Sequence, residues 1–212
     1  MPYHVYMNIT VFGASGHVGQ LVVAELVKRG HTVTAFVHGR IPFEKSKQIT
    51  VITGDVHSKK DVELALKNAD AVISTLGSWG TKTKDIVSSA MTNIIPVMEH
   101  HNIKRIVTLT GAAIMIDGDK KDVLQSLAHV SFGIVAGKIL RDGEDHIKQL
   151  QKTDLAWTTL RSPVMDDQNI SSYLLNATPP KPWEKISRKA ITKAIVDLIE
   201  SEMFVQRAPF IH

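Results

Sequence analysis

The sequence predicts a single α/β domain over residues 1–212, built on a doubly wound parallel sheet with helices on both of its faces. Short runs that are apolar at nearly every position alternate with longer segments of helical periodicity, which is typical of strands buried on both sides. A glycine-rich turn joins the first apolar run to the first helical segment. The 212 residues suffice for one core, and no repeat, low-complexity tract or linker divides them.

The expected strands are the short apolar runs, and right-handed crossovers between them make the sheet doubly wound. In such a sheet, ligands bind beyond the carboxyl ends of the strands, so the loops that follow the strands are the candidates for function. The strands are expected at residues 9–12, 32–37, 49–52, 71–76, 105–110 and 156–161, with the tail 204–212 as a candidate for one more.

The helices are expected where apolar residues recur every three or four positions. The first spans residues 17–30 and ends at Gly30, and the second opens at Ser58 with a capping box whose acid is Asp61. A third begins near Thr83 and contains Pro96, which should kink or interrupt it. Further helices are expected at residues 137–152 and from Ser187, with an irregular stretch at residues 162–183.

The glycine-rich turn is the strongest functional signal. It reads Gly13-Ala14-Ser15-Gly16-His17-Val18-Gly19, a GxxGxxG spacing in place of the usual GxGxxG. Glycines let the backbone turn sharply and approach a ligand, and the start of the following helix offers free N–H groups to a pyrophosphate. The turn therefore predicts a dinucleotide site in a Rossmann-type fold, and a purely structural turn is the alternative.

The loop after the second strand indicates which dinucleotide is bound. Proteins of this architecture that use NAD carry a carboxylate there, about 20 residues past the glycines, to bind the ribose hydroxyls. This chain has His38-Gly39-Arg40 and no acid. An arginine can bind a 2′-phosphate through a planar, charge-assisted contact, so the loop favours NADP(H) over NAD. A solvated loop arginine is the alternative interpretation of Arg40.

Composition excludes several other classes of protein. The net charge of +4 comes from scattered residues, so no nucleic-acid partner is expected, and without cysteine there are no disulfides, thiolate catalysis or cysteine metal sites. The chain shows no signal peptide or membrane-spanning run, so we expect a cytoplasmic protein without a membrane partner.

No metal site is expected, because the adjacent His100 and His101 and the isolated His146 lack a His-x-x-x-His spacing with a nearby acid. Asp142, Glu144 and Asp145 are expected in surface ion pairs.

Several longer motifs resemble one known group of proteins. They are Val11-Phe12-Gly13-Ala14-Ser15-Gly16-His17-Val18-Gly19, the strand 33–37 before the basic loop, Gly54-Asp55-Val56, Ala71-Val72-Ile73-Ser74-Thr75-Leu76-Gly77, and Leu155-Ala156-Trp157-Thr158-Thr159-Leu160-Arg161-Ser162-Pro163. On these motifs the chain resembles the atypical short-chain dehydrogenase/reductase superfamily. More narrowly, it is similar to the NAD(P)H-binding, NmrA-like group that includes biliverdin-IXβ/flavin reductase.

The resemblance implies a role for each matched residue. It places Gly13, Ala14, Ser15, Gly16, His17 and Val18 around the pyrophosphate, Arg40 with His38 at the 2′-phosphate, Asp55 and Val56 beside the adenine, and Thr75, Leu76 and Gly77 along the nicotinamide-side ribose. Thr110 occupies the end of the fifth strand, where relatives often have serine. Lys138 fits the lysine of the Tyr-x-x-x-Lys pair of active dehydrogenases, but Ile134 stands in place of the tyrosine. Thr110 and Lys138 are the catalytic candidates.

The missing tyrosine disfavours an alcohol or ketone dehydrogenase. The first hypothesis is an NADPH-dependent oxidoreductase that passes hydride to a flat, conjugated small-molecule acceptor such as a flavin, quinone or tetrapyrrole. Trp79 and Pro163 are the candidates for facing that acceptor, and a packing role is the alternative interpretation of Trp79. The second is a non-catalytic, NADP(H)-binding redox sensor like the NmrA regulators. A third, a nucleotide-sugar epimerase or dehydratase, is weakened by the missing tyrosine and the short C-terminal part. A homodimer is the oligomeric state that we consider.

Overall fold

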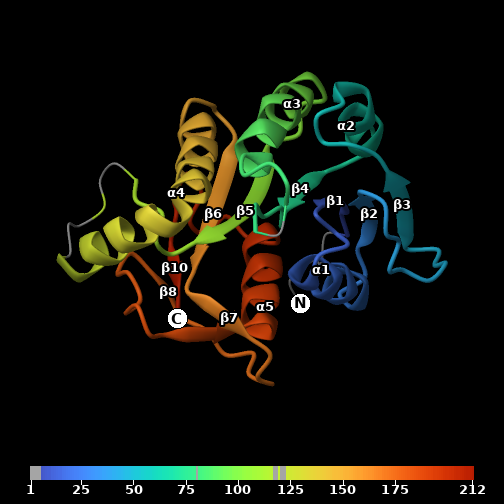
Figure 1. Ribbon diagram of the computed structural model, residues 1–212. Coiled ribbons are helices and arrows are strands. Elements are labelled where there is room, and N and C mark those ends of the chain that lie inside the picture. The colour runs from blue at the N-terminus through green and yellow to red at the C-terminus, as the bar shows by residue number, and fades with distance from the viewer. Residues whose placement is uncertain (1–5, 80, 117–118, 120–122) are drawn as a thin grey trace.

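A largely parallel sheet of eight strands organises the protein in the computed structural model, which describes residues 6–79, 81–116, 119 and 123–212, with the side chains of residues 123–135 left out (Figure 1). Its order is β3-β2-β1-β4-β5-β6-β10-β8, and only the outermost described pair, β10 with β8, is antiparallel. A separate two-stranded sheet joins β7 (Val164–Asp166) to β9 (Lys185–Ser187). The bounds in the large sheet are β1 Asn8–Phe12, β2 Thr32–Val37, β3 Ile49–Thr53, β4 Ala71–Ser74, β5 Arg105–Gly111, β6 Ala156–Ser162, β8 Leu175–Asn176 and β10 Phe210–Ile211.

Helices cover both faces of the large sheet, as the sequence predicts. Figure 1 shows α1 (His17–Lys28) beside α5 (Arg188–Ile199) on one face, and α2 (Lys59–Leu66), α3 (Ile86–His100) and α4 (Val123–Gln151) on the other. Two apolar clusters fill these layers, and neighbouring residues of one strand enter different clusters: Val11 faces α1 and α5, whereas Phe12 faces the other helices. This division confirms the doubly wound Rossmann-type fold.

Local signals set two of the helix ends correctly. α1 ends at Lys28, and Gly30 follows in the left-handed conformation, with φ +93°, that favours glycine. Ser58 caps α2 by accepting a hydrogen bond from the N–H of Asp61 at 3.3 Å. Asp61 does not complete a capping box, because its carboxylate accepts a hydrogen bond from the N–H of Asp55 at 3.0 Å. This hydrogen bond holds the loop after β3.

Four predicted boundaries need correction. β4 ends at Ser74 instead of residue 76, because the chain turns at Thr75 to contact the glycine turn. α3 begins at Ile86, not near Thr83, and runs through Pro96 without interruption. α4 begins at Val123 and is broken at Ala136, so the helix predicted from residue 137 is only its second part. The stretch predicted as irregular contains β7 and β8, while the tail does add β10.

A buried polar cluster lies between α4 and the sheet. The hydroxyls of Thr108 and Thr159, which face each other on β5 and β6, are 2.8 Å apart, and Nε2 of His146 lies 3.1 Å from the Thr108 hydroxyl. His146 is fully buried, so it has no surface role. Burial lowers its pKa to about 4 although the nearby Asp142 carboxylate acts in the opposite direction. His146 is therefore neutral in the folded protein at physiological pH.

This neutral histidine makes stability depend on pH. The pKa of His146 is lowered by folding, so the unfolded chain binds the proton more tightly and stability falls as pH drops from about 6.5 towards 4. The loss at pH 5 is expected to be about 2 kcal/mol of unfolding free energy. Urea unfolding of the wild type and of His146→Gln at pH 7.5 and 5 measures it, because the variant lacks the titrating ring. His57→Gln alters an exposed histidine and is the control, so it should keep the wild-type pH dependence. If the unfolding free energy changes equally with pH in the wild type and in His146→Gln, His146 is not the titrating group.

Candidate cofactor site

The strand order reverses between β1 and β4, and the loops after these two strands meet there. β1 pairs with β2 on one side and with β4 on the other. The N–H of Thr75 donates to the carbonyl of Phe12 at 3.0 Å, and the Thr75 hydroxyl lies 3.2 Å from the carbonyl of Gly13. In open α/β sheets this switch point is where a dinucleotide binds.

The three glycines of the turn have different functions. Gly13 has φ +75°, and a Cβ there would lie 2.9 Å from backbone atoms of Thr75 and Leu76. A Cβ on Gly19 would lie 2.2 Å from the carbonyl oxygen of Gly13. These two glycines allow the close packing of turn, loop and helix. Gly16 is exposed, and its Cβ would meet only the Gly13 carbonyl, so it forms the outer surface of the turn.

The start of α1 has the features of an anion site. Gly16 is the N-cap residue, its backbone is extended, and no described side chain caps this end of the helix. The first turn contains no acid that would repel a phosphate. The amide of Gln20 donates to the carbonyl of Ser15 at 2.8 Å and holds the turn in place. The chain therefore fits a diphosphate at this position.

The predicted pyrophosphate residues divide into two groups. Ser15, Gly16 and His17 are partly or fully exposed, so the backbone of all three and the side chains of Ser15 and His17 can reach a ligand. Ala14 and Val18 are buried and pack in the core, so only their backbone groups are available. The sequence motif did not distinguish these two groups.

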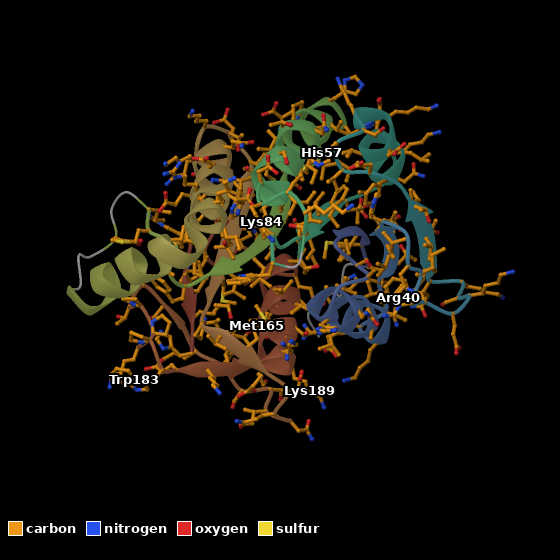
Figure 2. The ribbon with its side chains drawn as sticks, in the orientation of Figure 1. Arg40, His57, Lys84, Met165, Trp183 and Lys189 are labelled. Carbon is orange, nitrogen blue, oxygen red and sulfur yellow. The ribbon has the colours of Figure 1, made fainter. Side chains whose placement is uncertain are left out.

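The loops at the far end of the predicted site lie beside each other. Nδ1 of His38 is 3.3 Å from the carbonyl of Gly54, which links the loop after β2 to the loop after β3. Arg40 is exposed, lies on the outside of the protein beyond β2 (Figure 2), and has no ion pair with any described residue. Its guanidinium is available to an anion.

The predicted adenine-side residues lie in a segment that is held by hydrogen bonds. The side chain of Asp55 accepts from the N–H of His57 at 2.9 Å, and the side chain of Asn93 on α3 donates to the carbonyl of Val56 at 2.9 Å. A Cβ on Gly54 would lie 2.8 Å from Asp61 and 2.9 Å from Phe36, so glycine is required there for close packing. Val56 itself is buried, which leaves Asp55 as the more accessible of the two predicted residues.

The loop after β4 is held by a residue that we did not predict. Asp142 on α4 is 3% exposed, and its carboxylate accepts from the N–H of Ser88 at 2.6 Å, from the N–H of Val87 at 3.2 Å, and from the hydroxyl of Ser78. Asp142 thus caps α3 and fixes the loop that begins with Thr75, Leu76 and Gly77. It is not in a surface ion pair, which corrects that prediction for Asp142; Asp145 does pair with Lys148 at 3.7 Å. Gly80, at the end of this loop, lies outside the described residues.

Three of the catalytic and acceptor-side candidates come from neighbouring strands, and the fourth, Lys138, lies on α4. Trp79 follows β4 and is 65% exposed, Thr110 lies near the end of β5, and Pro163 follows β6. A Cβ on Gly143 would lie 2.9 Å from the Thr110 hydroxyl, so α4 passes close to it. Lys138 is exposed on α4, two residues past the break at Ala136, and no described contact joins it to Thr110. The side chain of Ile134 lies outside the described residues.

The two described tyrosines lie away from this edge. The ring of Tyr6 packs over Gly30, at the far end of α1 from the glycine turn. The hydroxyl of Tyr173 donates to Asp197 on α5, and burial together with this hydrogen bond raises the pKa of Tyr173. Asp197 also accepts from Arg29, just past the end of α1. Among the described residues, no tyrosine therefore supplies a proton at the predicted site.

Arg161 is a second residue that sequence reasoning missed. It lies in β6, is 2% exposed, and donates two hydrogen bonds to the carboxylate of Asp119. It also donates to the carbonyl of Ile114 at 3.1 Å and lies 3.7 Å over the ring of Phe210. Arg161 therefore anchors the loop after β5 to the sheet. An arginine within an apolar strand was the signal that could have identified it.

The fold and the turn define a class of protein: an α/β protein whose glycine turn lies at the switch point of its parallel sheet. The chain belongs to the NAD(P)H-binding family, whose model matches residues 13–202. This match confirms the resemblance that the motifs indicate and the expected NAD(P)H cofactor class. Across the described residues, no helix combines the length and the apolar composition needed to cross a bilayer.

Similar proteins include several reductases. Over 108 residues the chain is 34% identical to an isoflavone reductase homolog from Zea mays, and over 106 residues it is 31% identical to a 2-alkyl-3-oxoalkanoate reductase from Stenotrophomonas maltophilia. These matches cover 46% and 48% of this chain but 33% and 32% of the relatives, so the chain matches about a third of their length.

Solved structures share the whole fold. A short-chain dehydrogenase/reductase from Veillonella parvula in complex with NADP has a TM-score of 0.80 at 22% identity, over 98% of this chain and 94% of that one. A candidate NADH-flavin reductase from Streptococcus pneumoniae has a TM-score of 0.72 at 22% identity, over 97% and 98%. At these identities the similarity establishes the Rossmann-type fold.

Proposed function

We propose that this protein is an NADPH-dependent reductase that acts on a flat, conjugated acceptor of the flavin, quinone or tetrapyrrole class. The observation that carries the proposal is the uncapped start of α1 at the switch point, with Trp79 exposed on the adjoining loop. The NADP complex of the Veillonella parvula protein and the reductase descriptions of the relatives support it.

The chain's own residues would bind and orient both molecules. The backbone of residues 13–18 would hold the diphosphate, with Arg40 and His38 at the 2′-phosphate and Asp55 beside the adenine. The Thr75 hydroxyl already holds the glycine turn, so the ribose next to the nicotinamide would be contacted mainly by backbone groups of the loop after β4. When bound, NADPH supplies a hydride.

The acceptor would lie against Trp79, Thr110 and Pro163. An exposed indole can stack on a flat ring system, which favours a conjugated acceptor over a small alcohol or ketone. Because no described tyrosine reaches this edge, the proton that accompanies the hydride would come from solvent. A flavin or quinone suits that arrangement, since the protein then contributes mainly orientation.

Turnover of NADPH, followed at 340 nm with a panel of flavins, quinones and tetrapyrroles, tests the proposal. We expect oxidation with at least one of these acceptors, and a raised KM for it in Trp79→Ala with NADPH affinity unchanged. Tight NADPH binding without turnover on any acceptor would instead support the redox-sensor hypothesis, in which the same loops contact a protein partner. The homodimer and the cytoplasmic location stay predictions from the sequence.

Replacing Arg40 tests the choice of cofactor. Arg40→Ala should weaken NADPH binding by about tenfold or more, because a charge-assisted contact to the 2′-phosphate is lost, while NADH binding changes little. Fluorescence titration with both cofactors measures the difference. Lys45→Ala removes another exposed cation from the same loop and is the matched control. Equal losses for NADPH and NADH in Arg40→Ala would contradict the assignment.

A further inference from the structure

Three possible metal ligands meet on the surface between α2 and α3. The atoms that Glu63, His100 and His101 could offer to a metal all lie within 4.8 Å of one another. Nε2 of His101 is 4.0 Å from a carboxylate oxygen of Glu63, too far for a hydrogen bond. Glu63 comes from α2 and the two histidines from the end of α3, so the fold brings together groups that lie 37 and 38 positions apart.

One of these atoms lacks a partner. Nε2 of His101 is buried, and no described group forms a hydrogen bond with it. A buried polar atom without a partner is costly, so it indicates a missing ligand or water. A hollow of about 390 Å³, lined by Lys59, Glu63, Pro96, Val97 and His100, opens beside the same residues.

The backbone at this point is firmly held. The N–H of Asn102 donates to the carbonyl of Glu99 and the N–H of Ile103 to that of Met98, which together end α3 as a Schellman motif. Asn102 has φ +56°, as that motif requires. Both histidines are therefore presented from a backbone that is fixed before any metal binds, which lowers the entropic cost of binding.

We propose that Glu63, His100 and His101 bind a Zn²⁺ ion that links α2 to α3. Two imidazoles and one carboxylate form a ligand set that zinc uses in proteins, and imidazole favours zinc over magnesium or calcium. Ligand atoms bound at about 2.0–2.2 Å lie closer together than they do here, so small side-chain rotations would complete the site. A water molecule would fill the fourth position. The C-terminal end of α3 attracts cations, which adds to the affinity.

This site is separate from the cofactor site. α3 starts after β4, at the edge of the sheet that carries the glycine turn, and its last turn leads into β5 at the opposite edge. The ion would therefore stabilise the packing of two helices and take no part in hydride transfer. Whether zinc binds at this site is therefore independent of the proposed reductase activity.

Titration calorimetry of tag-free, chelator-treated protein with zinc chloride tests the proposal. We expect one equivalent to bind, and affinity to fall by about tenfold or more in Glu63→Gln and in His100→Gln. Glu99→Gln, which removes the neighbouring exposed carboxylate, is the matched control and should bind as the wild type does. His101→Gln should also lose zinc binding. If that variant folds poorly, Glu63→Gln and His100→Gln still test the proposal, because both alter exposed side chains.

Cobalt provides a second measurement. Co²⁺ bound to the wild type should give the visible absorption of a four-coordinate site, and Glu63→Gln should lose it. Zinc should also raise Tm in the wild type and in Glu99→Gln but not in Glu63→Gln. Binding without defined stoichiometry, or equal affinity in Glu63→Gln and the wild type, would overturn the proposal.

Discussion

Gly16→Asp is expected to abolish NADPH binding while leaving the protein folded. Gly16 is exposed, and an added Cβ would lie 3.2 Å from the carbonyl oxygen of Gly13, so a small shift of the turn is needed to accommodate the side chain. Its backbone, with φ −72° and ψ 165°, is that of an N-cap, where aspartate stabilises a helix by a few tenths of a kcal/mol relative to glycine. The new carboxylate would nevertheless lie at the proposed position of the diphosphate. Juxtaposed like charges cost several kcal/mol, so the loss should exceed about a hundredfold.

Gly16→Asn separates the effect of charge from that of size. Asparagine has nearly the same shape and is an equally good N-cap, but it does not repel a phosphate. Its affinity for NADPH should therefore lie between those of the wild type and Gly16→Asp. Affinities from fluorescence titration and Tm values from thermal unfolding together test the site. If Gly16→Asp binds NADPH normally, the diphosphate does not lie at the start of α1 and the reductase proposal loses its basis.

The largest expected effect on stability comes from Arg161→Met. Methionine fills much of the same space, but the carboxylate of Asp119 is left largely buried without its partner. Breaking a buried ion pair in this way costs about 3–5 kcal/mol, which for a chain of this size lowers Tm by about 10 °C. The cation–aromatic contact with Phe210 is lost as well. Urea and thermal unfolding measure both quantities.

Arg161→Met combined with Asp119→Asn provides the control. If the main cost is the unpaired carboxylate, the double variant should be more stable than Arg161→Met alone, and the double-mutant cycle should give a large coupling energy. Additive effects would show that Arg161 acts through its contacts with Ile114, Ala208 and Phe210 instead.

Much of the fold could be predicted because its signals are local. The six expected strands, the glycine turn and the ends of α1 depend on residues close together in the chain. Ser58 caps α2 as expected because its hydroxyl and the N–H that donates to it are only three residues apart. The boundaries that were wrong depend on distant groups. α3 begins at Ile86 because the carboxylate of Asp142 accepts hydrogen bonds from its first turn, 54 and 55 positions earlier in the chain.

The candidate site also has a part set by local signals and a part set by distant contacts. The glycine motif located the turn, and the surroundings of the turn agree with a dinucleotide site. The sequence did not reveal that Asp142 holds the loop after β4 or that Arg161 holds the loop after β5 through Asp119, 42 positions away. His146 lies on the helix face shared with Leu140, Ile147 and Leu150, a spacing from which its burial could have been inferred.

The sequence by itself determined the fold class, the position of the glycine turn and the cofactor class. Apolar periodicity and glycine spacing act within a few residues, so composition and order are enough to identify them. Only the tertiary structure decided which polar groups are buried and what they bind, including the pairing of Arg161 with Asp119 and the meeting of Glu63 with His101. Burying a charged or polar group is favourable only when a partner satisfies it, and that partner is supplied by whichever segment the fold brings alongside.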